Sequence, residues 1–170
     1  HANTAVEKTA GGALSVTPLR PAGVLFQYNG APLCIDPYGL PDGLALPRAD
    51  IVLLTHLHPD HFDPACLRKI AGPATVFIVP RGCGQAVSGN VPHAETIVLE
   101  NGKSHTFKGI NIRAVPAYNL MGRDATGAPY HPAGQGNGYL LDFQGFRVYL
   151  AGDTEKIRDM EKLGPVDVAF

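Results

Sequence analysis

The residues best suited to chemistry lie in one stretch of ten, "THLHPDHFDP" (55–64), which holds three of the chain's seven histidines. His56, His58, Asp60 and His61 form the pattern H-x-H-x-D-H. Histidine is the commonest neutral metal ligand, and aspartate supplies an oxygen that binds harder cations. An exposed loop could contain one histidine by chance, but the whole pattern favours a metal site.

The apolar run "DIVLLT" (50–55) leads directly into this pattern and is typical of a buried strand. Side chains two residues apart on an extended segment point to the same side, so His56 and His58 can bind one ion. Asp60 and His61 are adjacent and need not share that direction, so they can face a second ion. The spacing therefore allows a site for one or two metal ions.

Two helices are predicted around these elements. Asp63 is a suitable N-cap for a helix that begins at Pro64 and ends near Gly72. A second helix is expected over 155–163, before Gly164 and Pro165. Elsewhere, short apolar runs separated by two-residue turns indicate a hairpin-rich sheet. The predicted hairpin turns are Asn29-Gly30, Asn101-Gly102 and Gln144-Gly145.

Composition indicates a globular protein, with 45% hydrophobic residues, 17% charged residues and a net charge of -1. There is no basic block, which argues against nucleic acid as a partner. No apolar run approaches the ~20 residues that a membrane-spanning helix needs. The three cysteines form no C-x-x-C pair and leave the compartment open. We expect a cytoplasmic protein, or a periplasmic or secreted one if the N-terminus at His1 is processed.

These motifs resemble those of the metallo-β-lactamase-fold hydrolases. Residues 55–61 look like the metal-binding motif of that superfamily, and "CIDPYG" (34–39) looks like the strand end that precedes it. "YLAGDTE" (149–155) resembles a later strand that ends in a metal-bridging aspartate. With "VPAYNL" (115–120) and "HPAGQGNGY" (131–139), the chain is similar to a branch of uncharacterised zinc-dependent hydrolases, distantly similar to L-ascorbate-6-phosphate lactonases.

The resemblance covers about residues 14–170 and implies an α+β fold, a metallo-β-lactamase-like αββα sandwich in one metallo-hydrolase domain. Residues 1–13 are expected to form a flexible leader. "VDVAF" (166–170) is predicted to be a buried strand, and family chains continue beyond this point to a further metal-binding histidine. We therefore expect the chain to lack the C-terminal part of the fold, or a homo-oligomer partner to complete its sheet.

The resemblance also implies roles for single residues. His56 and His58 would bind the first ion, Asp60 and His61 the second, and Asp153 would bridge them.

The family usually has another histidine where this chain has Tyr118 and Asn119. His131 is a candidate replacement ligand, although it could equally be a surface histidine in a Gly/Pro-rich loop. Asp36 is expected to orient a ligand through hydrogen bonds.

Zinc lowers the pKa of bound water to about 7, which makes hydroxide available at neutral pH. The predicted function is a zinc-dependent hydrolase that uses metal-bound hydroxide on an ester, lactone, amide or phosphoester bond of a small molecule. Asp60 and His131 are the candidate catalytic residues. No G-x-S-x-G motif is present, so no serine nucleophile is implied.

His58 favours one or two Zn²⁺ ions, since the di-iron proteins that the chain resembles have a carboxylate at this position, but manganese or iron would also fit. The alternative function is a non-catalytic metal-binding domain, or a half-domain that depends on a partner.

Overall fold

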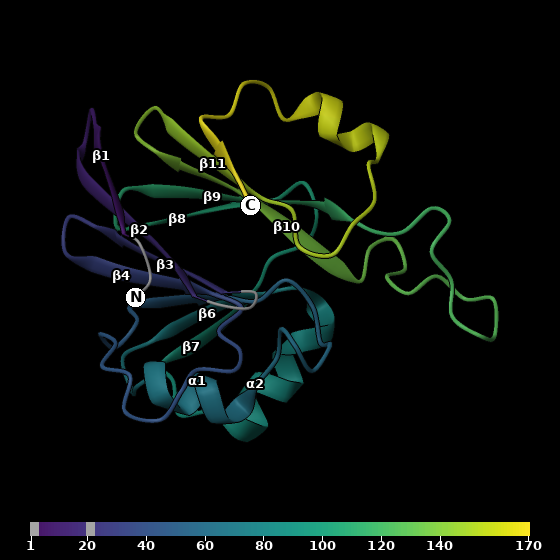
Figure 1. Cartoon of the computed structure of the whole chain (residues 1–170), viewed down its shortest axis with the longest axis horizontal. Helices are drawn as coiled ribbons and strands as arrows, with labels where there is room; N and C mark the ends of the chain where they lie inside the picture. The colour runs from purple at the N-terminus through teal and green to yellow at the C-terminus, as the bar shows by residue number, and fades with distance from the viewer. Residues whose placement is uncertain (1–3, 20–22) are drawn as a thin grey trace.

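Two β-sheets lie face to face in the computed structural model, which describes residues 4–19 and 23–170 (Figure 1). The first sheet has seven strands in chain order: β1 (Ala5–Thr9), β2 (Gly12–Leu19), β3 (Gly23–Tyr28), β4 (Ala31–Ile35), β5 (Ile51–Leu53), β6 (Val76–Val79) and β7 (Glu95–Val98). The second has five, in the order β12 (Val168–Ala169), β11 (Phe146–Leu150), β10 (Gly136–Phe143), β9 (Ile110–Ala117) and β8 (Ser104–Phe107).

Helices cover the outer faces of both sheets. The helices α1 (Pro64–Ile70) and α2 (Gly84–Asn90) pack on the first sheet, and the short 3-10 helix η1 (Arg81–Cys83) precedes α2. The second 3-10 helix, η2 (Arg158–Lys162), lies over the second sheet, against which Met160 packs. The predicted α+β sandwich, with helices outside two facing sheets, is confirmed.

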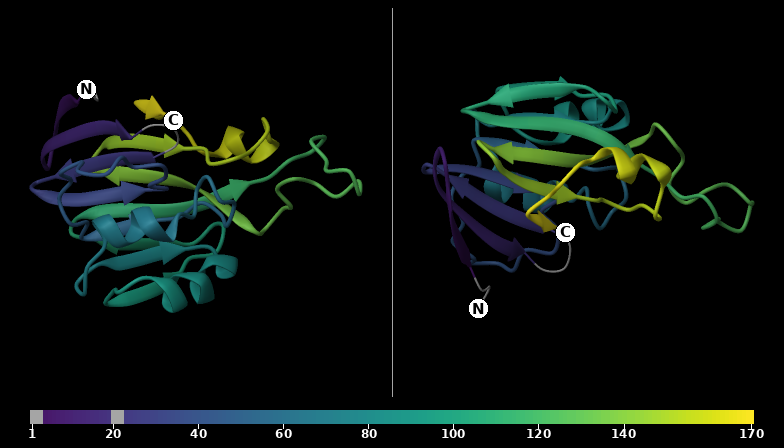
Figure 2. Two further views of the ribbon diagram at one scale, coloured as in Figure 1. Left: turned by 60° about the horizontal axis from the view of Figure 1, so that its bottom comes forward. Right: turned by 90° about the horizontal axis from the view of Figure 1, so that it is seen from above.

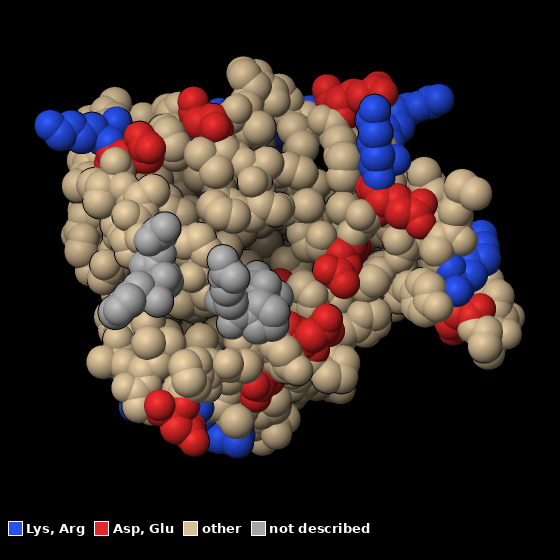
Figure 3. Space-filling model, viewed as in Figure 1, with Lys and Arg blue, Asp and Glu red and all other residues tan. Residues whose placement is uncertain are grey.

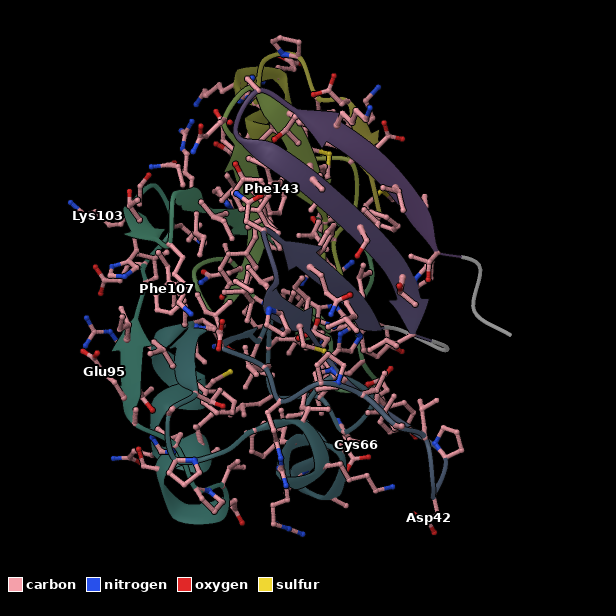
Figure 4. All side chains as sticks on the ribbon, turned by 90° about the vertical axis from the view of Figure 1, so that its left-hand side faces the viewer. Asp42, Cys66, Glu95, Lys103, Phe107 and Phe143 are labelled. Atoms are coloured by element: carbon pink, nitrogen blue, oxygen red, sulfur yellow. The ribbon has the colours of Figure 1, made fainter. Side chains whose placement is uncertain are left out.

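The core has two main layers because the central strands are apolar on both faces. In β5, Ile51 and Leu53 point between the sheets, whereas Val52 packs toward the helices. Figure 4 shows Phe143 among the side chains between the sheets, where its ring lies 5.6 Å from that of Phe26. Such burial on both faces fixes where β5 ends, and therefore where the loop after it begins.

Strands β4, β5, β6 and β7 are parallel, so their C-terminal ends meet at one edge of the sheet. Ile35 of β4 pairs with Leu53 of β5, and Asp36 N donates to Leu53 O at 3.1 Å. This register brings Asp36 beside the residues that follow β5. The sequence-predicted ligand loop therefore starts next to a buried carboxylate.

The predicted helix after the ligand loop is confirmed. Asp63 Oδ1 accepts hydrogen bonds from Ala65 N and Cys66 N at 2.9 and 3.1 Å. Such caps stabilise a helix by about 1 kcal/mol. Leu67 and Ile70 are buried against the first sheet. The helix thus anchors the loop on its C-terminal side.

Two of the three hairpin predictions are confirmed: Asn29-Gly30 joins β3 to β4, and Gln144-Gly145 joins β10 to β11. The hairpin predicted at Asn101-Gly102 is wrong, because β7 and β8 belong to different sheets. There the chain crosses between sheets, and Gly102 N donates to Ala114 O of β9 at 2.8 Å. A two-residue turn signal specifies a local reversal and does not specify which strands pair.

Three other expectations differ from the structure. The helix expected over 155–163 is only the 3-10 helix η2, although Ile157 is buried just before it. Part of the expected leader forms β1 and the start of β2, which pair with each other, while residues 1–3 lie outside the described part. Residues 166–170 form only the short strand β12 beside β11, and Phe170 is 42% exposed instead of buried.

The loop between β9 and β10 extends away from the body of the molecule, as both views in Figure 2 show. On the face seen in Figure 3, lysine and arginine side chains are scattered among acidic ones and form no continuous basic surface. Within residues 4–19 and 23–170, no helix has the length and apolar character needed to span a membrane.

Candidate metal centre

Four side chains from three separate loops converge on one point. His56 and His58 follow β5, His131 lies in the loop between β9 and β10, and Asp153 follows β11. Each offers one ligand atom, and these atoms all lie within 4.8 Å of one another. His131 Nε2 lies 3.0 Å from His58 Nδ1 and 3.3 Å from Asp153 Oδ2. The fold therefore assembles a His₃Asp group from distant parts of the sequence.

The Asp153 carboxylate lies between this group and His61. Its Oδ1 is 3.2 Å from His61 Nε2, whereas its Oδ2 faces His131 and His56 at 3.3 and 3.8 Å. The Asp60 side chain is 60% exposed, and its Oδ2 lies 3.9 Å from His61 Nε2. The structure thus brings together the six residues singled out from the sequence, with Asp60 at the exposed rim: His56, His58, Asp60, His61, His131 and Asp153.

A buried threonine determines which nitrogen of His56 faces the group. Thr55 Oγ1 donates to Asp36 Oδ2 at 2.5 Å, because a carboxylate surrounded by donors accepts. The same hydroxyl oxygen lies 2.9 Å from His56 Nδ1 and so accepts its proton. His56 Nε2 is left with a lone pair, is buried, and has no hydrogen-bond partner. The unprotonated Nε2 can therefore bind a cation.

Asp36 orients His61 in the same way. This carboxylate is 2% exposed, and it accepts from Thr55 N and from His61 Nδ1, both at 2.8 Å. His61 Nε2 is therefore directed at Asp153. Burial lowers the pKa of His61, but the hydrogen bond and charge of Asp36, with Asp153 and Asp60, raise it above its ordinary value. As expected from the sequence, Asp36 orients a candidate ligand.

His131 is oriented by Asn119, across the base of the extended loop. Asn119 Oδ1 accepts from His131 N at 3.1 Å and lies 2.5 Å from His131 Nδ1. Asn119 N donates to His131 O at 2.9 Å. The amide orientation is fixed because Asn119 Nδ2 donates to Glu155 Oε1 at 3.2 Å, and a carboxylate accepts. His131 Nδ1 thus holds its proton, and Nε2 faces His58 and Asp153.

The side chain of Glu155 binds the backbone of this loop. Its carboxylate accepts from Leu120 N at 3.1 Å, from Met121 N at 3.0 Å and from Gly122 N at 2.6 Å. These backbone hydrogen bonds, led by that from Gly122, hold the pKa of Glu155 below its ordinary value. Glu155 follows Asp153 by two residues, so one short segment supports both the aspartate and the loop of His131.

The residues present fit a divalent cation. Burial, followed by the neighbouring His61 charge, lowers the pKa of His56 to about 4, and burial also lowers the pKa of His131. A neutral imidazole is the form that binds metal. The outward-facing Nδ1 atoms of His56, His61 and His131 already have partners, as in histidine sites whose outer hydrogen bonds fix the ring. The unpartnered buried His56 Nε2 is a polar atom that an ion would satisfy.

Gly152 determines how closely the two halves of the site approach. Its φ is +62°, and a Cβ there would lie 3.1 Å from both Asn137 O and the Thr55 Cβ atom. A side chain would be strained by the backbone conformation and crowded by these neighbours. Glycine therefore lets the chain before Asp153 pass directly against the start of the histidine loop.

Sequence reasoning missed the residues that orient the ligands. Thr55, Asn119 and Glu155 all occur in quoted motifs, yet none was assigned a role from the sequence. A usable signal existed for Asn119, since it occupies the position where the family usually has a histidine. No local pattern indicates that Glu155 bonds to a loop more than thirty residues earlier in the chain.

The fold and the site define an α+β metallo-β-lactamase-like sandwich with a His/Asp metal-binding group. Residues 26–170 match the model of the "Beta-lactamase superfamily domain" family. The chain belongs to this family.

Proteins similar to this chain in sequence or structure are described as metal-dependent hydrolases. A UPF0173 metal-dependent hydrolase from Thermococcus onnurineus is 31% identical over 148 residues, which cover 81% of this chain and 62% of that protein. Its Thermococcus kodakarensis counterpart is 33% identical, with the same coverage of both chains. The crystal structure of a proposed metal-dependent hydrolase from Parabacteroides distasonis has a TM-score of 0.88 and 34% identity, covering all of this chain and 74% of that one. The chain thus spans about 62% of the length of these curated relatives.

Proposed function

We propose that this chain is the metal-binding part of a metal-dependent hydrolase. His56, His58, His131 and Asp153 would hold one cation, and Asp60 and His61 would hold a second that shares Asp153. The convergence of the first four ligand atoms within 4.8 Å is the observation on which the proposal rests. The names of the relatives from Thermococcus support the reaction class.

Zinc is the proposed metal, because imidazole nitrogen and one carboxylate oxygen suit its borderline character. When bound, such a cation supplies Lewis acidity, which acidifies water and polarises a substrate oxygen. The protein's own residues would hold the cation and orient its ligands. Asp36, Thr55 and Asn119 fix the imidazoles, and the exposed Asp60 can accept a hydrogen bond from an attacking water.

The substrate is proposed to be a small molecule with an ester, lactone, amide or phosphoester bond. The group consists of three histidines and one aspartate, and all four are assigned to the metal in this proposal. Water is therefore the proposed nucleophile, and its proton would pass to a carboxylate at the rim.

Metal analysis of the purified protein tests this proposal. We expect one to two equivalents of zinc per chain by elemental analysis, and loss of at least one equivalent in His56→Ala and Asp153→Ala. His105→Ala is the matched control, because His105 lies in β8, away from the group. A screen of ester, lactone, amide and phosphoester substrates should then show hydrolysis that a chelator abolishes. Bound zinc without any hydrolysis would favour the alternative, a non-catalytic metal-binding domain.

A further inference from the structure

A cavity of about 310 Å³ opens directly beside the metal centre. Its lining includes His56, His58, His131 and Asp153, so a molecule inside it touches the proposed ligands. This volume is at the lower end of the range for ligand pockets, about 300–1,000 Å³. It suits a small group of a substrate and is too small for a large ligand.

Carbon-rich side chains form much of the remaining wall. They are Leu57, Cys83, Ala117, Tyr130 and Pro132, interspersed with exposed or part-exposed glycine backbone. Leu57 is 43% exposed and Tyr130 55% exposed, so both present carbon surface to water at this wall. The Cys83 thiol is buried, and burial raises its pKa to about 12, so it is uncharged at neutral pH.

Three of the polar residues of the wall, Thr55, Arg81 and Asn137, have partners within the protein, and Gln135 adds an exposed, uncharged amide. Asn137 Nδ2 donates to Leu99 O at 2.8 Å, and its Oδ1 accepts from Asn101 Nδ2 at 2.7 Å. Thr55 is bound to Asp36 and His56. Arg81, the cation among the lining residues, is paired with Glu100.

A charged group placed against the carbon wall, away from the metal ligands, would therefore lose water without gaining an opposite charge that is not already paired, and such burial is costly. An apolar group would instead cover carbon surface that is exposed to water. We propose that this cavity binds an uncharged, apolar part of the substrate, of the size of a short acyl chain or a single ring, beside the metal centre. The proposal rests on the proposed function, because it assigns the substrate class for that same site.

Gly82 offers a way to test the wall without touching a proposed ligand. It lines the cavity, and a Cβ added there would meet no atom within 4 Å. Gly82→Leu should fill part of the cavity, and Gly82→Asp should place a carboxylate in it. Gly89 in α2 has equally open surroundings and does not line the cavity, so Gly89→Leu and Gly89→Asp are matched controls.

The experiment measures equilibrium binding of neutral amides to the zinc-loaded protein by NMR titration. From acetamide to butanamide to hexanamide, affinity should rise roughly three- to fourfold per added methylene. 6-Aminohexanamide, which places an ammonium group at the far end of a similar chain, should bind at least tenfold more weakly than hexanamide. Gly82→Leu and Gly82→Asp should lose most of the gain from chain length, whereas the Gly89 variants should keep it.

Affinity that does not depend on chain length, equal binding of hexanamide and 6-aminohexanamide, or unchanged hexanamide binding in both Gly82 variants would overturn the proposal. Rates for 4-nitrophenyl acetate, butyrate and hexanoate then separate it from the proposed function. Chain-length-dependent binding without turnover would contradict the hydrolase and leave the cavity assignment intact. Zinc-dependent turnover without chain-length preference would contradict the cavity assignment alone.

Discussion

Asn119 Oδ1 lies 2.5 Å from His131 Nδ1, and this contact fixes the imidazole so that its other nitrogen faces the metal centre. The two residues belong to opposite ends of the extended loop. The position of His131 is therefore maintained by a contact across the base of that loop.

Replacing Asn119 should weaken metal binding without removing a ligand. In Asn119→Ala, His131 loses the acceptor that holds its Nδ1 proton. Removing such a hydrogen-bond partner of a metal-binding histidine lowers metal affinity by about 10–100-fold. Competition with a chromophoric chelator measures the change. Asn111→Ala, on the exposed side of β9, should bind zinc like the parent protein. Equal zinc affinity in Asn119→Ala and the parent would contradict the assigned role.

Glu155 should order the start of the extended loop in a pH-dependent way. Backbone donors hold its pKa below the ordinary value, so the folded state favours the carboxylate. The order that it provides should be fully present above the unfolded pKa of about 4.3 and should be lost as the pH falls through the lower folded value. Amide hydrogen exchange at Leu120, Met121 and Gly122 measures this order.

In Glu155→Ala the protection factors of these amides should be lower wherever the parent carboxylate is ionised, and they should no longer fall as the solution is acidified. Glu161→Ala, in η2, changes an exposed glutamate that does not contact the loop and should leave exchange unchanged. Protected amides in Glu155→Ala would show that other contacts hold the loop.

Asp36→Asn should lower the pKa of His61 in the metal-free protein. The folded-state pKa of His61 is raised, so its contribution to stability is complete below the unfolded value of about 6.5 and is lost as the pH rises through the folded value. An asparagine side chain at this position would tolerate the backbone φ of +41° while removing the charge. Imidazole NMR titration measures the pKa, and chemical denaturation measures stability.

We expect the variant to lose about 1–3 kcal/mol in the free energy of unfolding, because donors from Thr55 and His61 lose their carboxylate acceptor. Asp142→Asn, which changes a part-exposed aspartate at the β10–β11 hairpin, is the control. An unchanged His61 titration in Asp36→Asn would refute the electrostatic coupling.

Removing metal should lower thermal stability by mass action. A ligand present at 100 times its dissociation constant stabilises the folded state by about 2.7 kcal/mol. The melting temperature with zinc should therefore exceed that with EDTA in the parent and in His105→Ala. The difference should vanish in a variant that combines His56→Ala, His58→Ala and Asp153→Ala, because Asp153 is shared by both proposed ions. A zinc effect that persists in this triple variant would place the stabilising ion elsewhere.

The sequence predicted those parts of the site that are written in short local patterns. The H-x-H-x-D-H pattern, the buried strand before it and the Asp63 cap depend on neighbouring residues, and local physics determines them. The fold class followed from resemblance in these motifs. Asp36 could be assigned a role because "CIDPYG" resembles the strand end that precedes the metal-binding motif in the family.

Long-range contacts were harder to predict. The pairing of Asn119 with His131, and of Glu155 with the loop that carries both, depends on how two loops meet after the sheets have packed. The Asn101-Gly102 turn was assigned to a hairpin because a turn pair contains no information about which sheet the next strand joins. Instead of the helix expected over 155–163, the structure has only a short 3-10 helix. This helix follows the segment in which Thr154 and Glu155 form hydrogen bonds with the loop.

Gly152 influences the distance between the two halves of the metal centre. Because Gly152 packs against the Thr55 side chain and Asn137 O, the position of the backbone before Asp153 depends on the absence of a Cβ at this residue. A single added methyl group at this position would act as a spacer and would push the two halves of the site apart. The distance between the carboxylate and the imidazoles would then depend on a residue that is not itself one of the candidate ligands.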